Sequence, residues 1–276
     1  MYKIIEKRMI VPNIHMMRVS APAIAKKCRP GQFVIVMVDE KGERIPLSIS
    51  DWNRDEGIIT IVFMEVGTST RKLAKLKEGD ELFALAGPLG SPSEISKFGT
   101  VLCIGGCYGI GTIYPISKAL KEEGNKVITL LEARSSFLLY WEDKLRSVSD
   151  ELLLLTRDGT SGISGHVPTA IKEIVQKEKI DRVIVNGCTF LLMVASEATK
   201  PFGIKTIVSL NPIMIDGTGM CGVCRVSISG KTKFACVDGP DFDGHEVDWE
   251  ILLMRRSAYL KEEFESIRYL ECEEIF

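Results

Sequence analysis

Three cysteines and one aspartate near the C-terminus have the spacing of a metal site. Cys221 and Cys224 form a C-x2-C pair, Cys236 follows after eleven intervening residues, and Asp216 lies five residues before Cys221. Plant-type two-iron, two-sulfur clusters are held by C-x4-C-x2-C and one distant cysteine. Asp216 occupies the first position of that pattern, and iron accepts oxygen as well as sulfur ligands. We therefore predict that these four side chains hold a two-iron cluster, and that the chemistry is electron transfer.

Two other interpretations of the cysteines stay open. Structural zinc sites usually present their ligands as two close pairs, whereas Cys236 has only His245, nine residues later, as a nearby candidate partner. The thiols could also be small buried hydrophobic groups. Three cysteines at ferredoxin spacing, among Gly217, Gly219 and Gly222, favour the cluster. A backbone that wraps a cluster needs residues that tolerate positive φ.

Composition excludes several classes of function. The 276 residues are 45% hydrophobic and 26% charged, which is typical of a globular protein with room for two or three domains. A formal net charge of −2 gives no electrostatic case for a nucleic-acid or anionic-membrane partner. No apolar run approaches the ~20 residues that span a bilayer. The N-terminus alternates charged and apolar residues, which predicts a strand and not a signal peptide. Eight cysteines without a disulfide pattern indicate a reducing, cytoplasmic location.

Hydrophobic patterning divides the chain into three parts. Residues 1–96 carry short apolar runs separated by turn residues, which predicts an antiparallel β-barrel; the clearest runs are 31–38, 57–66 and 80–88. Residues 97–208 alternate buried strands with helices, which predicts an α/β domain with a parallel sheet. Its strands are expected at 100–106, 126–133, 151–156 and 181–188, and its helices at 113–124 and 167–179. Residues 209–276 form the iron–sulfur segment, closed by one helix over 251–271.

A glycine-rich turn, GGCYGIGTIYP, joins the first strand of the α/β domain to its first helix at residues 105–115. Such a turn lets a pyrophosphate approach the backbone at a helix N-terminus, where free N–H groups favour anions. The glycines do not spell G-x-G-x-x-G, so a turn that needs glycine only for packing stays an alternative.

A barrel, an α/β domain opening with GG-x-x-GIG and a ferredoxin-spaced segment together resemble the ferredoxin–NADP reductase superfamily, in particular its iron–sulfur flavoprotein subunits. One branch contains the electron-transfer subunits of dihydroorotate dehydrogenase, in which the first cluster ligand is cysteine. The other contains the small subunits of NADH-dependent ferredoxin:NADP oxidoreductase, also called sulfide dehydrogenase beta subunits. Asp216 matches the Asp-plus-three-Cys cluster of this second branch.

The resemblance implies FAD in the barrel. ERIPLSIS is similar to the motif in which an arginine reaches the FAD pyrophosphate and a serine lies beside the flavin ring, which implicates Arg44 and Ser48. This sequence departs from the common R-x-Y-S form, because Leu47 replaces the tyrosine and one extra residue follows Arg44. VGTSTRK resembles the segment that holds the FAD diphosphate and implicates Gly67, Thr68, Ser69 and Thr70.

The resemblance also implies a nicotinamide nucleotide. The phosphate turn would use Gly106, Gly109, Ile110 and Gly111. TRDGTSG resembles a second nucleotide segment and implicates Asp158 and Gly159, with Arg157 where an acidic residue is common. Asn186-Gly187-Cys188 takes the place of the C-G-P turn that meets the nicotinamide, so Cys188 is a candidate, with a buried structural thiol as its alternative.

Nucleotide choice depends on the end of the strand at 126–133. An acid there accepts hydrogen bonds from the adenosine ribose, whereas a nearby arginine favours a 2′-phosphate. Glu132 therefore favours NAD(H), and Arg134 favours NADP(H). Because the resemblance places the small-subunit branch on the NAD(H) side of its complex, we favour NAD(H).

The predicted function is an electron relay from NAD(P)H through FAD and the cluster to a larger iron–sulfur flavoprotein subunit, running in either direction, with ferredoxin as one candidate acceptor. Hydride transfer needs no protein acid or base, so no catalytic side chain is predicted. The alternatives are a dihydroorotate dehydrogenase electron-transfer subunit, and a non-catalytic redox sensor or zinc-stabilised binding module.

Overall fold

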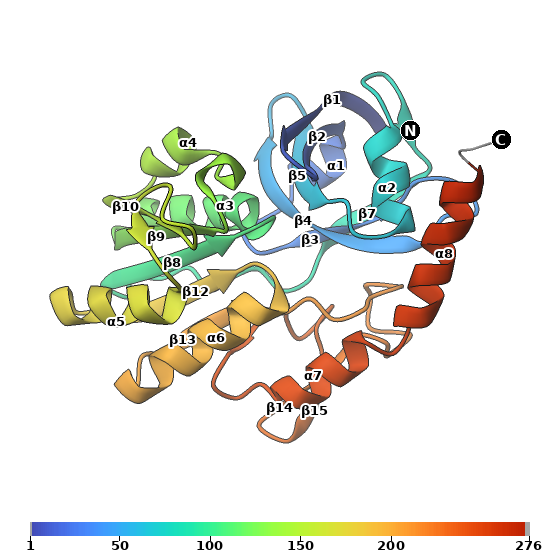
Figure 1. Ribbon diagram of the computed structural model, residues 1–276. Helices are drawn as coiled ribbons and strands as arrows, with labels where there is room; N and C mark the ends of the chain where they lie inside the picture. The colour runs from blue at the N-terminus through green and yellow to red at the C-terminus, as the bar shows by residue number, and fades with distance from the viewer. Residues whose placement is uncertain (1, 274–276) are drawn as a thin grey trace.

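The structure, a computed structural model, describes residues 2–273, and its N-terminal part is an antiparallel barrel (Figure 1). The sheet order is β6-β1-β2-β5-β4-β3-β7. Its two edge strands, β6 and β7, are neighbours in the sequence, so the sheet curls until its edges nearly meet. The strands are β1 (Tyr2–Val11), β2 (Ile14–Ser20), β3 (Phe33–Met37), β4 (Arg44–Asn53), β5 (Ile58–Met64), β6 (Glu81–Leu82) and β7 (Ala84–Leu89).

The barrel encloses an apolar core because its strands turn β-branched and aromatic side chains inward. Met17, Ile59, Ile61 and Phe63 are at most 2% exposed. Two helices complete the unit, α1 (Pro22–Ala25) and α2 (Thr68–Lys75). Leu73 anchors α2 in this core.

The second sheet is parallel except at one edge. Its order is β11-β10-β9-β8-β12-β13-β16, and only β16 runs antiparallel to its neighbour. The order reverses between β8 and β12, and in open α/β sheets ligands bind outside the carboxyl ends of the strands at such a switch point. The strands are β8 (Thr100–Gly106), β9 (Lys126–Ala133), β10 (Glu151–Thr156), β11 (Ile163–Ser164), β12 (Arg182–Asn186), β13 (Thr206–Ser209) and β16 (Asp241–Asp243).

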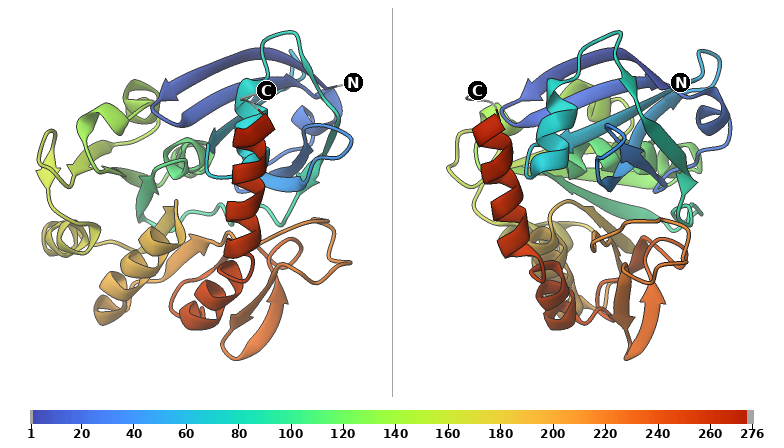
Figure 2. Two further views of the ribbon diagram at one scale, coloured as in Figure 1. Left: turned by 45° about the vertical axis from the view of Figure 1, so that its right-hand side comes forward. Right: turned by 90° about the vertical axis from the view of Figure 1, so that its right-hand side faces the viewer.

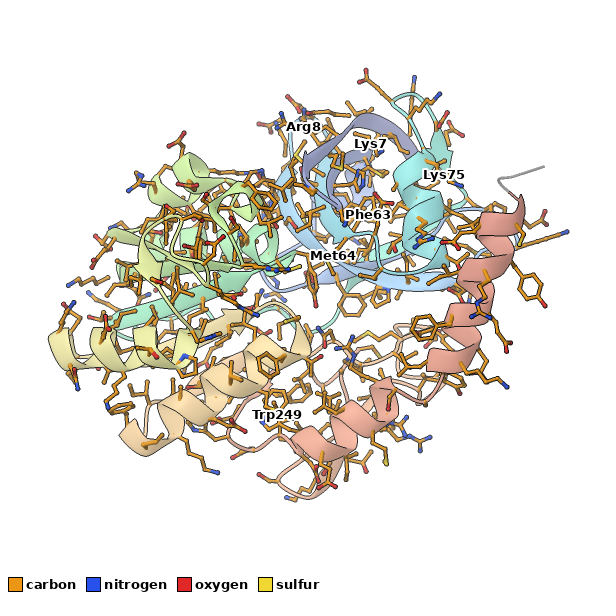
Figure 3. The ribbon with its side chains drawn as sticks, in the orientation of Figure 1. Lys7, Arg8, Phe63, Met64, Lys75 and Trp249 are labelled. Atoms are coloured by element: carbon orange, nitrogen blue, oxygen red, sulfur yellow. The ribbon has the colours of Figure 1, made fainter. Side chains whose placement is uncertain are left out.

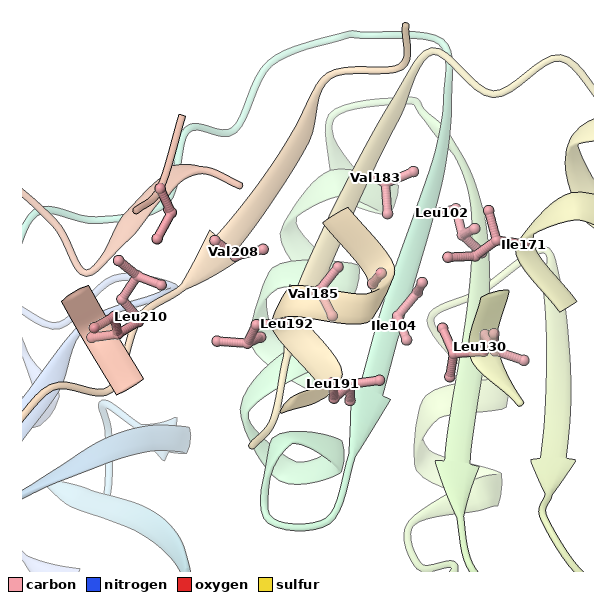
Figure 4. Close-up of a cluster of buried hydrophobic side chains, with 14 of the residues drawn as sticks. Leu102, Ile104, Leu130, Ile171, Val183, Val185, Leu191, Leu192, Val208 and Leu210 are labelled. Carbon is pink, nitrogen blue, oxygen red and sulfur yellow. The ribbon is translucent and has the colours of Figure 1, made fainter. Parts of the chain in front are cut away.

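Helices cover both faces of this sheet (Figure 1). Leu102 and Val185 on the sheet pack with Ile171 and Leu192 on the helices of one face (Figure 4). This face carries α5 (Val167–Lys177) and α6 (Thr189–Thr199), and the other carries α3 (Gly109–Glu122) and α4 (Glu142–Arg146). The short 3-10 helices are η1 (Ser136–Leu138) and η2 (Lys200–Phe202).

Buried residues of the barrel and of the α/β unit pack together in hydrophobic clusters. Val62 of the barrel packs with Ile110 and Ile113 of α3 in one of these clusters. The approach is close, because a Cβ added at Gly111 would lie 2.8 Å from Val62 Cγ2. Lys144 of α4 also pairs with Asp51 of β4. The two units therefore meet along the side of the sheet that carries α3.

The C-terminal segment leaves the parallel sheet after β13 and then returns to it. It carries the cysteine loop and a hairpin of β14 (Arg225–Ile228) and β15 (Lys231–Phe234), then pairs Asp241 of β16 with Ser209 of β13. Asp241 also accepts a 2.6 Å hydrogen bond from the hydroxyl of Ser93, in the connection between barrel and sheet.

The prediction of one closing helix over 251–271 is wrong. The structure has two helices, α7 (Trp249–Arg256) and α8 (Leu260–Glu273), separated at residues 257–259. The Ser257 hydroxyl donates to Met254 O, and such a local bond competes with continued helix. The helices also pack against different units. α7 buries Leu252 in the core of the parallel-sheet unit, whereas α8 lies beside α2 of the barrel (Figure 2).

Candidate functional site

The loop at residues 214–236 brings two of the predicted cluster ligands into contact. Cys224 and Cys236 are buried, with their Sγ atoms 3.2 Å apart, and Cys221 is exposed on the same loop. Burial, and then the neighbouring Cys224 thiol, raise the pKa of Cys236 to about 12. Without a metal the Cys236 thiol would stay protonated, because a coordinating metal is what deprotonates a thiol in such surroundings.

Asp216 is fixed by its own turn. Its Oδ2 accepts hydrogen bonds from Thr218 Oγ1, from Thr218 N at 2.9 Å and from Met220 N at 3.2 Å. These bonds, the Thr218 hydroxyl first, lower the pKa of the Asp216 carboxyl. Gly217 and Gly219 have φ near +80° and +88°, which is the conformation predicted for glycines that wrap a cluster.

The loop does not resemble a preformed zinc site. Among the residues that the structure describes, no three His, Cys, Asp or Glu side chains gather as the ligands of one metal ion. A two-iron cluster divides its ligands between two irons, and here Asp216 and Cys221 precede the contacting pair Cys224 and Cys236 in the loop.

The cluster loop packs against the barrel. A Cβ at Gly217 would lie 2.8 Å from Ile35 Cγ1 and from Leu89 Cδ1, on β3 and β7. β3 pairs with β4, where Phe33 faces Ser48 and Ile35 faces Pro46. The loop that carries Asp216 therefore lies against a strand next to the one that carries both predicted flavin residues, Arg44 and Ser48.

The N-terminus of α2 has the donors of an anion site. Thr70 Oγ1 accepts hydrogen bonds from Val66 N at 3.0 Å and Gly67 N at 3.1 Å, which caps the helix. A Cβ at Gly67 would meet nothing within 4 Å, so this backbone faces open space. The first-turn N–H groups have no partner within the helix itself, and such groups bind phosphate in many proteins.

A cavity of about 160 Å³ lies beside this helix end. Two lysines, Lys41 and Lys72, supply positive charge, and Ser266 of α8 closes one side by bonding to Thr68 with 2.7 Å between the hydroxyl oxygens. Glu43 is an opposing charge that accepts a 2.6 Å bond from the Ser69 hydroxyl. The lining residues are Val38, Lys41, Gly42, Glu43, Thr68, Ser69, Lys72 and Ser266.

These donors fit the FAD diphosphate predicted for this part of the barrel. Arg44 is exposed at the start of β4 and directly follows Glu43 of the cavity, and Ser48 is half-buried on the same strand. Sequence reasoning missed Lys41, Lys72 and Ser266. Lys72 ends the quoted segment VGTSTRK and Lys41 lies just before ERIPLSIS, so both could have been found there, whereas Ser266 lies almost two hundred positions away from Thr68.

The glycine-rich turn lies where β8 meets α3. A Cβ at Gly109 would be only 2.1 Å from the carbonyl oxygen of Asn186, so the turn requires glycine there. Ile110 N donates to Cys107 O at 3.2 Å, and Gly111 N donates to the Tyr140 hydroxyl at 3.0 Å. The Ile110 side chain is fully buried. These contacts favour a structural role for Ile110 and Gly111, whereas the close contact of Gly109 with Asn186 joins the turn after β8 to the turn after β12.

Three residues predicted at the nucleotide, Glu132, Arg134 and Asp158, lie at the ends of β9 and β10. Glu132 is 7% exposed and pairs with Arg157, whose Nε is 2.8 Å from Oε1. Asp158 accepts hydrogen bonds from both the backbone and the hydroxyl of Thr160, and these bonds lower the pKa of its carboxyl. Arg134 is exposed. Glu132 and Asp158 therefore lie at the ends of neighbouring strands, and the Arg157 pair was not foreseen.

Two thiols lie near the junction of barrel and sheet. Cys107 Sγ is 3.2 Å from Met64 Sδ. Met64 is the last residue of β5 and lies where the barrel meets the parallel-sheet unit (Figure 3). Burial raises the pKa of Cys107, and Cys188 is close enough to contribute. Cys188 is half-buried and occupies the N-cap position of α6. The end of a barrel strand thus meets the carboxyl ends of β8 and β12, where flavin and nicotinamide are expected to meet.

Comparison with known proteins decides the family. Residues 211–248 match the model of the iron-sulfur cluster binding domain of dihydroorotate dehydrogenase B. A Thermotoga maritima protein described as a dihydroorotate dehydrogenase B (NAD(+)) electron transfer subunit homolog is 45% identical, over 95% of this chain and 92% of its own. The chain belongs to the dihydroorotate dehydrogenase B electron transfer subunit family. Within this family's wider fold, a ferredoxin NADP+ reductase from Neisseria gonorrhoeae is 15% identical, has a TM-score of 0.59, and aligns over 73% of this chain and 90% of its own.

One solved structure resembles this family member over its whole length. It comes from the NADH-dependent reduced ferredoxin-NADP oxidoreductase, studied for flavin-based electron bifurcation. The two chains are 44% identical, align over 98% of each and have a TM-score of 0.93. These matches confirm the predicted superfamily, fold class, cofactor set, electron-transfer role and membership of a larger complex. The individual site residues stay predictions.

The described helices include none that is both long and apolar enough to cross a bilayer.

Proposed function

We propose that this subunit carries electrons between NAD(H) and a larger iron–sulfur flavoprotein subunit, using FAD on the barrel and a two-iron cluster on the C-terminal loop. When bound, the flavin supplies the exchange between the two electrons of a nicotinamide and the single electrons of a cluster. The observation that carries the proposal is the packing of the cluster loop, at Gly217, against Ile35 of β3, the strand beside β4 with its two flavin residues. Such packing would hold the two proposed cofactor sites next to each other.

The cluster ligands would divide into two pairs. Cys224 and Cys236, already 3.2 Å apart, suit one iron. Asp216 and Cys221 would then serve the other. A carboxylate is a harder ligand than a thiolate, so Asp216 would set a different potential from that of an all-cysteine cluster.

The FAD diphosphate would lie at the N-terminus of α2. Its negative charge would be met by the first-turn amides of Thr68, Ser69 and Thr70, by Gly67 and by the side chains of Arg44 and Lys72. Ser48 would lie beside the flavin ring. Lys72 also pairs with Asp39 at 3.1 Å, so this lysine is already held at the cavity.

The proposed nucleotide is NAD(H). Glu132 is available at the end of β9 to accept hydrogen bonds from the ribose, and its pair with Arg157 holds the carboxylate in place. The Thermotoga maritima relative is described with NAD(+), and the solved complex as NADH-dependent. Gly106, Gly109, Asp158, Gly159 and Cys188 would complete the nucleotide edge, with Arg134 exposed beside it.

A second candidate is an electron-transfer subunit of a dihydroorotate dehydrogenase. A Fusobacterium nucleatum protein with that description is 30% identical over 82% of this chain. Asp216 favours the ferredoxin:NADP branch, because the resemblance places cysteine at this position in the dihydroorotate branch. The two candidates differ in the partner subunit and share the relay within this chain.

The predicted domain boundaries and the predicted cellular location also stay proposals. The expected boundaries 1–96, 97–208 and 209–276 separate the flavin, nucleotide and cluster functions, although β16 of the last part completes the sheet of the second. The cytoplasm is the proposed location, because the eight cysteines are all free thiols and suit a reducing compartment.

The test compares two exposed cysteines in protein reconstituted with FAD, iron and sulfide under anaerobic conditions. Cys221→Ser should weaken or abolish the cluster EPR signal after reduction with NADH, whereas Cys272→Ser, on α8, should leave it unchanged. Native purification should recover a larger flavoprotein subunit. A wild-type chain whose flavin neither NADH nor NADPH reduces, or a Cys221→Ser variant with the wild-type cluster, would contradict the proposal.

A further inference from the structure

Residues from separate parts of the chain form one hydrogen-bonded network at the switch point of the parallel sheet. Tyr108 follows β8, Gly187 follows β12, Asn211 follows β13, Thr189 opens α6, and Arg256 ends α7. Tyr108 and Gly187 lie in the two predicted nucleotide turns, whereas Thr189, Asn211 and Arg256 belong to no motif that predicted a site. The network therefore joins three neighbouring strand ends to the helix that comes after the cluster loop.

The side-chain amide of Asn211 connects two turns that border the expected nicotinamide position, one at Tyr108 and one at Gly187. The Tyr108 hydroxyl donates to Gly187 O at 2.9 Å. Asn211 Nδ2 donates to the Tyr108 hydroxyl at 2.6 Å and to Gly187 O at 3.2 Å. Burial raises the pKa of Tyr108 to about 12, so its hydroxyl keeps its proton at neutral pH and remains a donor.

The other end of the same amide is held from the C-terminal segment. Asn211 Oδ1 accepts from Thr189 Oγ1 at 2.8 Å and from Arg256 Nη1 at 3.2 Å. Arg256 also donates to Thr189 Oγ1. Both partners of Asn211 Oδ1 are donors, and both partners of Asn211 Nδ2 are acceptors. The hydrogen bonds are therefore satisfied in only one of the two flipped orientations of the amide.

The two turns are in direct contact, so a shift in one is passed to the other. A Cβ at Gly187 would lie 2.9 Å from Gly106 O and 2.7 Å from Leu191 Cδ2. Cys188, the candidate at the nicotinamide, directly follows Gly187. A misplacement of ~1 Å at a reacting centre can cost on the order of 100-fold in rate.

We propose that Asn211 is a positioning residue of the nicotinamide-binding edge, fixing Tyr108 and the Gly187 carbonyl, and that Arg256 anchors it to α7. This inference rests on the proposed function and adds residues that the family resemblance did not supply. The hydrogen bonds of Asn211 go to Tyr108, Gly187, Thr189 and Arg256, so it acts through the turns that it joins.

The experiment uses the protein loaded with FAD and cluster, and follows flavin reduction at saturating NADH by stopped flow. Asn211→Asp keeps the shape and the acceptor oxygen but removes the donor to Tyr108 and Gly187. We expect it to slow flavin reduction by roughly 10- to 100-fold. The cluster EPR spectrum should not change, and the urea midpoint reports whether the fold is intact.

Tyr108→Phe keeps the ring and tests the same network from its other end. Because Asn211 acts through Tyr108, the double variant should be no slower than the slower single variant. Arg268→Met, on the exposed face of α8, is the matched control, and NADH should reduce the flavin of this variant at the wild-type rate. Arg256→Lys should slow the reaction less than Asn211→Asp, because it keeps a cation.

The outcomes separate this inference from the proposed function. Wild-type protein that NADH and NADPH both fail to reduce would overturn the two together. Normal reduction of wild type and of folded Asn211→Asp and Tyr108→Phe would overturn the positioning role alone. Two single penalties that multiply in the double variant would also overturn it, because independent effects would exclude action through one network.

Discussion

Gly109 gives the sharpest test of the nucleotide edge. In Gly109→Ala the added Cβ would lie 2.1 Å from Asn186 O, 2.4 Å from Asn186 C and 2.6 Å from Gly187 Cα. All three contacts are with backbone atoms of the β12 turn, which cannot rotate away as a side chain can. Relief requires the turn or the start of α3 to move by about 1 Å, at a cost of ~1–3 kcal/mol for overpacking.

The comparison variant is Gly106→Ala. Its Cβ would lie 2.6 Å from Leu191 Cδ2 and 2.9 Å from Glu132 Oε2, which are both ends of side chains. These groups can rotate, so we expect Gly106→Ala to lose less stability than Gly109→Ala. Urea unfolding measures stability, and NADH-dependent flavin reduction measures the site.

Because the turn is displaced, Gly109→Ala should raise the apparent KM for NADH or slow flavin reduction by roughly tenfold or more. Wild-type stability and kinetics in Gly109→Ala would refute the reasoning, because the turn would then tolerate a displacement that the contacts forbid. A larger loss in Gly106→Ala than in Gly109→Ala would also refute it, because rigid backbone contacts are the basis of the ranking.

Three further predictions concern the cluster, the flavin and the buried carboxyl. Asp216→Cys should retain a cluster and change its EPR spectrum and reduction potential; an unaltered spectrum and potential would show that Asp216 is not a ligand. Lys72→Met should weaken FAD binding by roughly fivefold; the factor is modest because this lysine is 35% exposed and solvent screens its charge. The control Lys77→Met should bind FAD as tightly as wild type. Equal FAD affinities of wild type and Lys72→Met in a fluorescence titration would show that Lys72 is not part of the diphosphate site. Burial raises the pKa of Asp241, so its contribution to stability is present at low pH and is lost as pH rises through the folded-state pKa. Asp241→Asn should therefore have a higher Tm than wild type at pH 7, with the difference shrinking in acid, and a lower Tm at pH 7 would contradict this account.

The strands of the parallel sheet were predictable because both of their faces are covered. A buried parallel strand reads as a nearly continuous apolar run, and the expected runs 100–106, 126–133 and 151–156 coincide with β8, β9 and β10. The glycine-rich turn was also found from local spacing alone, since a strand, four glycines and a helix follow one another in the sequence.

The missed features all depend on contacts between distant segments. β16 is the three residues Asp241–Asp243, without an apolar run, and only its pairing with β13 makes it a strand. The network at Asn211 and the contact between Thr68 and Ser266 likewise join residues that no local pattern connects. The break between α7 and α8 was missed because helix periodicity does not show that consecutive turns will pack on different units.

The return of the chain to β13 has a consequence for how such proteins diversify. Ser209 and Asp241 are paired across the strands, so residues 210–240 begin and end at adjacent points of one sheet edge. Insertions whose ends lie close together are the ones that folded domains tolerate best. The ends of residues 210–240 are therefore placed so that another segment of this kind could take their place without a change in the pairing of β13 with β16. A reductase with this sheet could in this way gain, lose or exchange its cluster-binding segment while the nucleotide-binding edge keeps its structure.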